Sequence, residues 1–374
     1  MCMQAPISIV FLEHFQALED PRQLTKVIYP LHEVLLLSLC AVISGAETFI
    51  DIADYGKEKE AFLKQLSPFK NGIPSHDTIG AIFSHLDPDG FQKCFVSWVS
   101  SLQKILPDIV SIDGKALCGA HNAGEPVLYM VSAWACRQRL VLGQEKVADK
   151  SNEITAVPKL LEMLMLKGAI VTLDAMGCQR TIAEGILEKE ADYVLALKGN
   201  QGTLHDDVVQ FFEQQLKEGF RHSRVDTLEK TEKSHGRLEF RRYTSTDDVD
   251  LLQERHNWPG LKSIVLVETR RSEHGKTQTE KRFYISSLPM DTERISEAIR
   301  SHWQVENCLH WVLDVVFLDD HCRVRKDNSP HIFHIVKQMA LNLIKQVQDK
   351  KSIRRKRKSA GWNNQFLLQV LHGT

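Results

Sequence analysis

The sequence lacks the features that mark several common classes of protein. Its eight cysteines are scattered and form no Cys-x-x-Cys pair, which argues against a zinc ribbon or a disulfide framework and fits a reduced, cytoplasmic setting. The most apolar stretch, Val34 to Ile43, spans about ten residues and is too short for a membrane helix. Residues 1–9 hold no charged segment followed by an apolar core, so no signal peptide is expected.

Strong net charge is also lacking, because the formal charge of the 374 residues is −1. Positive charge is nevertheless concentrated near the end, where Lys350 to Lys358 holds seven cations in nine positions. Such a run is an electrostatic footprint for phosphate, and a solvated, disordered tail is the alternative. The first reading makes four of these residues candidate DNA contacts: Arg354, Arg355, Lys356 and Arg357.

What is present begins with a helical region over residues 1–107. Apolar residues at helical spacing predict helices at 32–44, 46–66, 77–86 and 91–105, with Ser75 or His76 near the cap of the third. The turn at 71–75 resembles the joint of a DNA-reading helix-turn-helix, although most short helix pairs are packing units.

Residues 108–345 change to an α/β pattern. We expect strands at 109–112, 127–136, 140–147, 169–173 and 193–197, with helices at 154–166 and 179–189. A meander of three strands followed by alternating helices and strands predicts a mixed sheet with helices on both faces.

A β-rich insertion at about 202–288 interrupts this rhythm. It contains a helix at 202–218 and strands at 224–233, 236–245, 262–271 and 278–287. Long helices then follow at 291–313 and 329–347, and residues 346–374 form a basic C-terminal tail.

Three acids are the leading candidates for chemistry. Asp113 and Asp174 each end a short apolar, β-branched run, and Glu306 lies in a long amphipathic stretch. Carboxylates that converge from two strand ends and a helix form an oxygen-rich pocket, which suits hard divalent cations. A pair of such ions can clamp both oxygens of a phosphoryl transfer.

Other residues have weaker claims. Lys198 and Gln201 follow the fifth strand and are placed to hold substrate phosphates, or are plain turn residues. Arg237 shares a strand face with Arg241 and is a candidate phosphate contact. Two alternatives stay open: a zinc site of His302, Glu306 and His310, and a base-stacking Trp258, for which a buried turn tryptophan is the simpler reading.

The order of the acids, Asp on strand one, Asp after strand four and Glu on a late helix, is that of a ribonuclease-H-like fold. At these residues the chain resembles the DDE transposases of bacterial insertion sequences, and most of all the H-repeat-associated proteins of Rhs elements. The likeness covers nearly the whole chain and is carried by Ile112-Asp113-Gly114-Lys115, Leu173-Asp174-Ala175, residues 193–201, His235-Gly236-Arg237 and residues 302–311.

The resemblance implies a metal-binding catalytic triad of Asp113, Asp174 and Glu306 with two Mg²⁺ or Mn²⁺ ions. It also implies cleavage and transfer of DNA strands at the ends of a mobile element, by a homodimer or larger assembly. Lys115, beside Asp113, becomes a candidate DNA contact. The alternative is a non-catalytic or transposition-defective DNA-binding descendant.

One departure concerns the surroundings of the glutamate. Related transposases place Tyr, Arg and Lys around it, but here these positions are Ile299, His302 and Leu313. Arg300 and His302 are therefore the candidates for that DNA-contacting role.

Overall fold

The computed structural model describes residues 10–102, 108–119, 127–147, 153–221, 223–234, 237–273 and 276–373. Two expectations fall outside these ranges: the absence of a signal peptide at 1–9 and the end of the helix expected at 91–105. His235 and Gly236, which belong to one of the segments that carry the resemblance, lie outside them too. The side chain of Arg237, which opens a strand, lies outside them as well.

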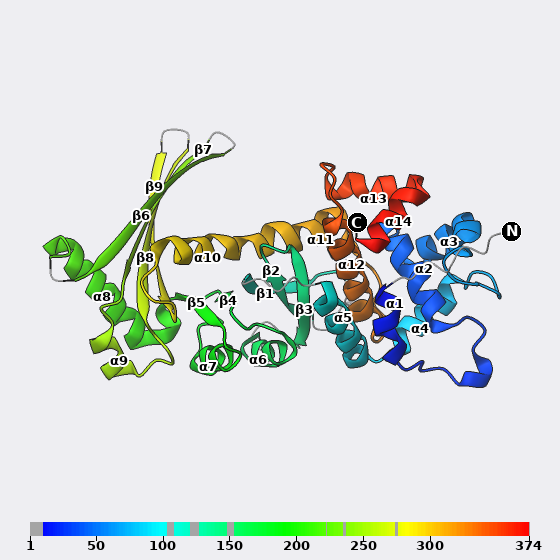
Figure 1. Ribbon diagram of the computed structural model, residues 1–374, viewed down its shortest axis with the longest axis horizontal. Coiled ribbons are helices and arrows are strands. Elements are labelled where there is room, and N and C mark those ends of the chain that lie inside the picture. The colour runs from blue at the N-terminus through cyan, green and yellow to red at the C-terminus, as the bar shows by residue number, and fades with distance from the viewer. Residues whose placement is uncertain are drawn as a thin grey trace.

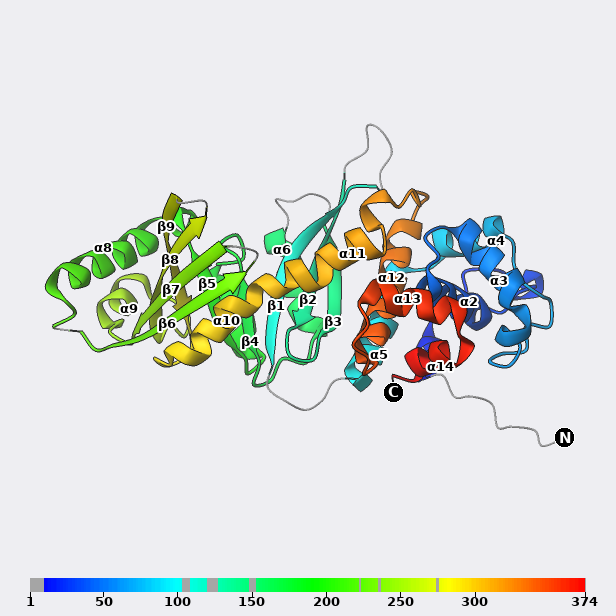
Figure 2. The same ribbon diagram turned by 90° about the horizontal axis from the view of Figure 1, so that it is seen from above.

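Helices from both ends of the chain form one end of the molecule (Figures 1 and 2). The N-terminal helices are α1 (Val10–His14), α2 (Leu31–Ser44), α3 (Phe49–Leu63), α4 (His76–His85) and α5 (Pro88–Leu102). Ser75 caps α4 as expected, because its side chain accepts a hydrogen bond from the Thr78 amide. Whether α3 and α4 read DNA stays a prediction.

A single mixed sheet runs through the rest of the molecule in the strand order β3-β2-β1-β4-β5-β9-β8-β7-β6. The first part is β1 (Ile109–Leu117), β2 (Leu128–Ala135), β3 (Leu140–Val147), β4 (Ile170–Leu173) and β5 (Asp192–Leu197). The β-rich part is β6 (Val225–Ser234), β7 (Arg237–Thr246), β8 (Ser263–Glu273) and β9 (Lys276–Ser286). Because β9 pairs with β5, the predicted insertion extends the same sheet.

Helices cover both faces of this sheet, as predicted. Figures 1 and 2 show α6 (Glu153–Met163) and α7 (Arg180–Glu188) on one face, and the long α10 (Thr292–Gln304) crossing the other. The helix α8 (Gly202–Glu218) lies beside the part of the sheet formed by β6 to β9, which together with α8 we call the arm. The arm also holds α9 (Asp250–His256), which the sequence pattern did not predict. After α10 come a π-helical turn (Val305–His310), α11 (Trp311–Val316) and α12 (Ser329–Gln346).

The first strand is longer than expected, and this corrects the position of Asp113. We expected Asp113 to close a strand ending at Ile112, but β1 continues to Leu117 because it keeps pairing with β2 beyond that point. Its pairing with the parallel neighbour β4 ends earlier, at Ser111 opposite Thr172. Asp113 therefore lies inside β1, just past the point where β4 leaves it.

The basic C-terminal segment is folded, which contradicts the expected tail. It forms α13 (Ile353–Trp362) and α14 (Asn364–His372), which pack against α2. Ser352 caps α13, and helical spacing turns Lys356 and Arg357 inward while Arg354 and Arg355 stay exposed.

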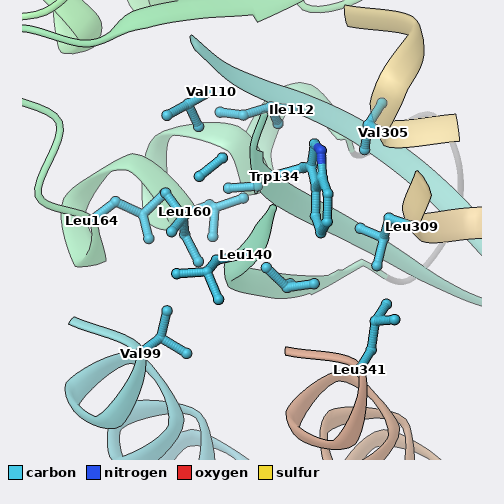
Figure 3. Close-up of a cluster of buried hydrophobic side chains, with 14 of the residues drawn as sticks. Val99, Val110, Ile112, Trp134, Leu140, Leu160, Leu164, Val305, Leu309 and Leu341 are labelled. Carbon is cyan, nitrogen blue, oxygen red and sulfur yellow. The ribbon is translucent and has the colours of Figure 1, made fainter. Parts of the chain in front are cut away.

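A hydrophobic cluster joins the sheet to the helices on its faces (Figure 3). Trp134 of β2 lies at its centre, close to Val305 and Leu309 of the π turn. All three side chains are almost fully buried, so they fix the π turn against the sheet. Val305 and Leu309 of this turn are buried, whereas the neighbouring Glu306 is exposed.

No single helix among the described residues is long and apolar enough to cross a membrane. The helices α2 and α3 meet the length and composition test only as a pair, and that pair is bent by 97°.

Candidate active site

The two aspartates are brought together by the register of two parallel strands. Ser111 of β1 lies opposite Thr172 of β4, and each aspartate follows two residues later. Residues two apart point to the same side of a strand, so this register directs Asp113 and Asp174 toward one edge. Asp174 is held there because its Oδ1 accepts hydrogen bonds from the Met176 amide at 3.0 Å and the Gly177 amide at 3.2 Å.

The glutamate reaches the same place from the other layer. Glu306 lies in the π turn that follows α10, and single π turns occur frequently at functional sites. All three acids line one cavity of about 300 Å³. The cavity is also lined by Thr172, Lys198, Glu280, Arg282, Tyr284, His302 and Trp303.

Negative charge is concentrated around Asp113. The pKa of Asp113 is raised to about 7, chiefly by burial and also by the nearby negative charges of Asp174, Glu153 and Glu306, while a hydrogen bond from the Gly114 backbone opposes the shift. Glu153, at the start of α6, was not predicted as part of the site. Its carboxylate lies where a side chain on Gly114 would point, so Gly114 leaves room for it.

The donor set fits a hard divalent cation. Its members are carboxylates, which Mg²⁺ and Mn²⁺ prefer, and their mutual repulsion is what a bound cation would relieve. Within the described ranges, no three His, Cys, Asp or Glu side chains are arranged as a closed metal site. The acids therefore share a cavity in this structure without enclosing one point, and the zinc alternative gains no support.

The two histidines of that alternative have other partners. His302 Nδ1 lies 3.0 Å from Thr172 Oγ1. His310 is buried, with Nδ1 3.5 Å from Asp113 Oδ2. Burial lowers the pKa of His310 to about 3, helped by the neighbouring positive charges of Lys115 and His334, so its ring is neutral at pH 7.

Several candidate DNA contacts have partners within the protein. The Lys115 ammonium is buried and pairs with Asp314 and, at 3.2 Å, with Asp320. Arg300 donates to Glu232 at 3.1 Å. Lys356 and Arg357 are buried, as described above. Arg300 is nevertheless exposed, as are Lys198, Arg354 and Arg355.

The segment after β5 supports the loop that carries Asp174. Gln201 Nε2 donates to the Cys178 carbonyl at 2.5 Å, and Asn200 Nδ2 donates to the Ala175 carbonyl at 2.6 Å. Gln201, a candidate phosphate contact, thus also has a positioning contact with this loop. Asn200 was missed, although it lies in the same segment and its amide gave the same signal.

The arm contributes two further residues that the sequence did not single out. Arg282 of β9 lies over the ring of Trp303, with 5.3 Å between the guanidinium carbon and the ring centroid. Trp303 is 39% exposed at the cavity, whereas Trp258 is buried, as the simpler reading expected.

Comparisons with known proteins show which family the chain belongs to. Residues 106–343 match the family described as "Transposase DDE domain", and residues 12–99 match "DDE_Tnp_1-associated". The chain is 40% identical over 375 residues to the H repeat-associated putative transposase YhhI of Escherichia coli strain K12, which covers 97% of this chain and 98% of that protein. The chain therefore belongs to the DDE transposase family, with H-repeat-associated relatives.

Two other relatives are also named as transposases. The putative transposase YncI of Escherichia coli O157:H7 is 39% identical over 368 residues, or 96% of this chain and 94% of that protein. The inactive transposase YbfQ of Escherichia coli strain K12 is 51% identical over 73 residues, which is 20% of this chain and 87% of that protein.

Proposed function

We propose that this protein is a metal-dependent DNA transposase that cleaves DNA strands at the ends of a mobile element and joins them to a target. The observation that carries the proposal is the register of Ser111 and Thr172, which puts Asp113 and Asp174 at one cavity with Glu306. In this proposal residues 108–345 form a ribonuclease-H-like catalytic domain that includes the arm at about 202–288, and residues 1–107 form a domain that contacts DNA.

Asp113, Asp174 and Glu306 would hold two Mg²⁺ or Mn²⁺ ions, which supply charge stabilisation for phosphoryl transfer when bound. The remaining roles belong to the chain itself. Asn200 and Gln201 keep the Asp174 loop in place through its carbonyls. Lys198 is exposed beside the cavity, where its ammonium can bind a phosphate of the strand being cut.

The proposed DNA surface differs from the sequence-based one. The exposed cations Arg354, Arg355 and Lys358 of α13 would contact the phosphate backbone. Replacing all three by alanine should weaken DNA binding and reduce the slope of log affinity against log salt by about 2 to 3. An unchanged slope would place the DNA elsewhere. A dimer or larger assembly on paired DNA ends is part of the proposal and is tested by the mass of the protein–DNA complex.

The deciding experiment is nicking and strand transfer by the purified full chain, on DNA carrying the ends that flank the gene. We expect cleavage with Mg²⁺ or Mn²⁺, none with chelator, and none from Asp113→Asn or Asp174→Asn. A non-catalytic DNA-binding descendant is the second candidate, because the described acids do not form a closed metal site. DNA binding without metal-dependent cleavage would favour it, and equal cleavage by Asp113→Asn would refute the triad.

A further inference from the structure

His302 ends a chain of hydrogen bonds that starts at a buried backbone carbonyl and becomes partly exposed at the histidine. The carbonyl oxygen of Ser301 is 3.4 Å from Ser111 Oγ, Ser111 Oγ is 3.0 Å from Thr172 Oγ1, and Thr172 Oγ1 is 3.0 Å from His302 Nδ1. The two hydroxyl residues are the register partners that precede Asp113 and Asp174. The chain therefore runs directly beneath the acids.

The direction of this chain follows from what each group can donate. A carbonyl oxygen only accepts, so Ser111 uses its one proton on Ser301. Thr172 then donates to Ser111, which leaves Thr172 Oγ1 as an acceptor for His302. The other neighbour of Ser111, Cys136 Sγ at 3.2 Å, is a thiol and a weak partner that can itself donate to Ser301 at 3.5 Å.

The direction of these hydrogen bonds determines whether the second ring nitrogen of His302, Nε2, carries a proton. If Nδ1 carries the proton, Nε2 of the neutral ring holds a lone pair. The ring lines the acid cavity, and within the described part of the chain Nε2 makes no hydrogen bond. An unprotonated ring nitrogen on a histidine that lines a cavity of carboxylates is suited to accept a proton and unsuited to bind a phosphate as a cation.

We propose that His302 is the proton acceptor for the attacking hydroxyl group in DNA cleavage and strand transfer, oriented by Thr172 and Ser111. This inference rests on the proposed function. In the step, the nucleophile, water or a 3′-hydroxyl, forms a new oxygen–phosphorus bond and gives its proton to Nε2. The bond from phosphorus to the leaving strand oxygen breaks, and that oxygen takes a proton from water. The imidazolium then releases its proton to solvent.

The surroundings keep the ring neutral. Burial lowers the pKa of His302, while the negative charge of Asp174 opposes this shift. The charged groups that share the cavity with it are Asp113, Asp174, Glu306 and Glu280, together with Lys198 and Arg282. The neutral, proton-accepting ring is thus the resting form at pH 7, and in this proposal His302 acts as a proton acceptor and not as a cation that binds phosphate.

The first test measures the tautomer and needs no activity. Nitrogen-15 spectra of histidine-labelled full chain should assign the proton of His302 to Nδ1. Thr172→Val keeps the shape of the side chain but removes its acceptor, and it should lower the Nδ1-protonated fraction. A proton on Nε2 in the wild-type protein would overturn the proposal.

The second test compares single-turnover cleavage by the wild type, His302→Gln and His302→Ala, with His205→Gln of α8 as the matched control. We expect the cleavage rate constant of the His302 variants to fall about 10²- to 10⁴-fold. Their DNA affinity should stay within about twofold, because a neutral ring releases no counterion. Imidazole should restore part of the rate of His302→Ala, and the acid limb of the wild-type pH profile should disappear in His302→Gln.

The outcomes separate the two proposals. An active wild type with an equally active His302→Gln overturns the proton role alone. A His302→Gln that loses DNA affinity and salt slope shows a phosphate contact, which also overturns it. A wild type that binds DNA without metal-dependent cleavage overturns the proposed function, and the proton role with it.

Discussion

Ser111 and Thr172 face each other across the parallel strands β1 and β4, and the Thr172 hydroxyl donates to the Ser111 hydroxyl at 3.0 Å. This one pairing sets the positions of three groups that matter for chemistry. It aligns Asp113 with Asp174, and it supports His302 from below through Nδ1. The acid pair and the histidine thus share a single buried support.

The crowding of acids leads to a prediction about stability. The folded protein holds the pKa of Asp113 at about 7, above its unfolded value of about 4, so the folded state binds this proton more tightly. Stability is therefore lost as pH rises from about 4 to 7. Without metal at pH 8, Asp113→Asn should be more stable than the wild type, by at most about 4 kcal/mol at 1.36 kcal/mol per pKa unit.

Urea unfolding at pH 5 and pH 8, with and without Mg²⁺, measures this effect. Saturating Mg²⁺ should stabilise the wild type but not Asp113→Asn, because only the former has the full ligand set. Asp54→Asn, at an exposed position of α3, is the control and should change little. An Asp113→Asn protein that is less stable than the wild type at pH 8 without metal would contradict the crowding argument.

Part of this arrangement could be predicted from the sequence, because it depends on local pattern. The β-branched runs predicted β4 and β5, and they placed Asp174 just after its strand. The extent of β1 could not be predicted, because Gly114 and Lys115 look like a turn and stay extended only through pairing with β2. The cavity contacts of Asn200 and Trp303 likewise depend on tertiary packing.

The basic run shows a second limit. The residue type does not show which cations of the run are exposed and which are buried. The packing of α13 against α2 decides this. Arg357 is buried where its guanidinium donates to the Val42 carbonyl near the end of α2, where helix carbonyls lack partners within the helix. The sequence does not indicate that an arginine from another segment binds there. The charge pattern therefore predicted four DNA contacts in this run, of which two, Lys356 and Arg357, are buried.

The support of the Asp174 loop gives a second prediction. Asn200→Ala removes the donor to the Ala175 carbonyl, so Asp174 should be held less firmly. Cleavage by this variant should need about 10- to 100-fold more Mg²⁺ for half-maximal rate, as found for residues that orient metal ligands. A Mg²⁺ titration of the cleavage rate measures it. Gln214→Ala in α8, where the exposed side-chain amide donates to Glu218, is the matched control. Equal Mg²⁺ dependence of the two variants would show that Asn200 does not position the site.

Arg357 carries the third prediction, which concerns folding. Its guanidinium donates to the Val42 carbonyl at 3.0 and 3.2 Å, and it stacks on the Phe317 ring at 4.2 Å. Lysine cannot reproduce this fork, so Arg357→Lys should lower the free energy of unfolding by about 2 to 5 kcal/mol. The exposed Arg355→Lys should stay within about 0.5 kcal/mol. Urea unfolding compares them, and equal stabilities would mean that α13 does not depend on this contact.

The same pair separates folding from DNA binding. Arg355→Ala should weaken DNA affinity and lower its salt dependence, because an exposed cation that meets a phosphate releases a counterion. Arg357→Lys keeps its charge inside the fold, so its DNA affinity per folded molecule should not change. The measurement is a salt titration of DNA binding for each variant. A larger loss of affinity in Arg357→Lys than in Arg355→Ala would place the DNA against the buried side of α13.

His331 of α12 gives a prediction about acid sensitivity. Its ring is buried, and within the described residues neither ring nitrogen has a hydrogen-bond partner. Burial lowers the pKa of His331 to about 4, helped by the positive charges of His334 and Lys146. Because the unfolded chain takes up this proton at about pH 6.5, the unfolded state binds more protons between pH 6.5 and 4. Stability should therefore fall as the pH drops through this window, by up to about 3 kcal/mol from this residue alone. Leucine is apolar, of similar size and without a titrating group, so His331→Leu should unfold at nearly the same urea concentration as the wild type at pH 7.5 and at a higher one at pH 4.5. Replacement of the exposed His76 by leucine should leave the pH dependence as it is. If His331→Leu loses as much stability on acidification as the wild type, the acid sensitivity comes from other groups.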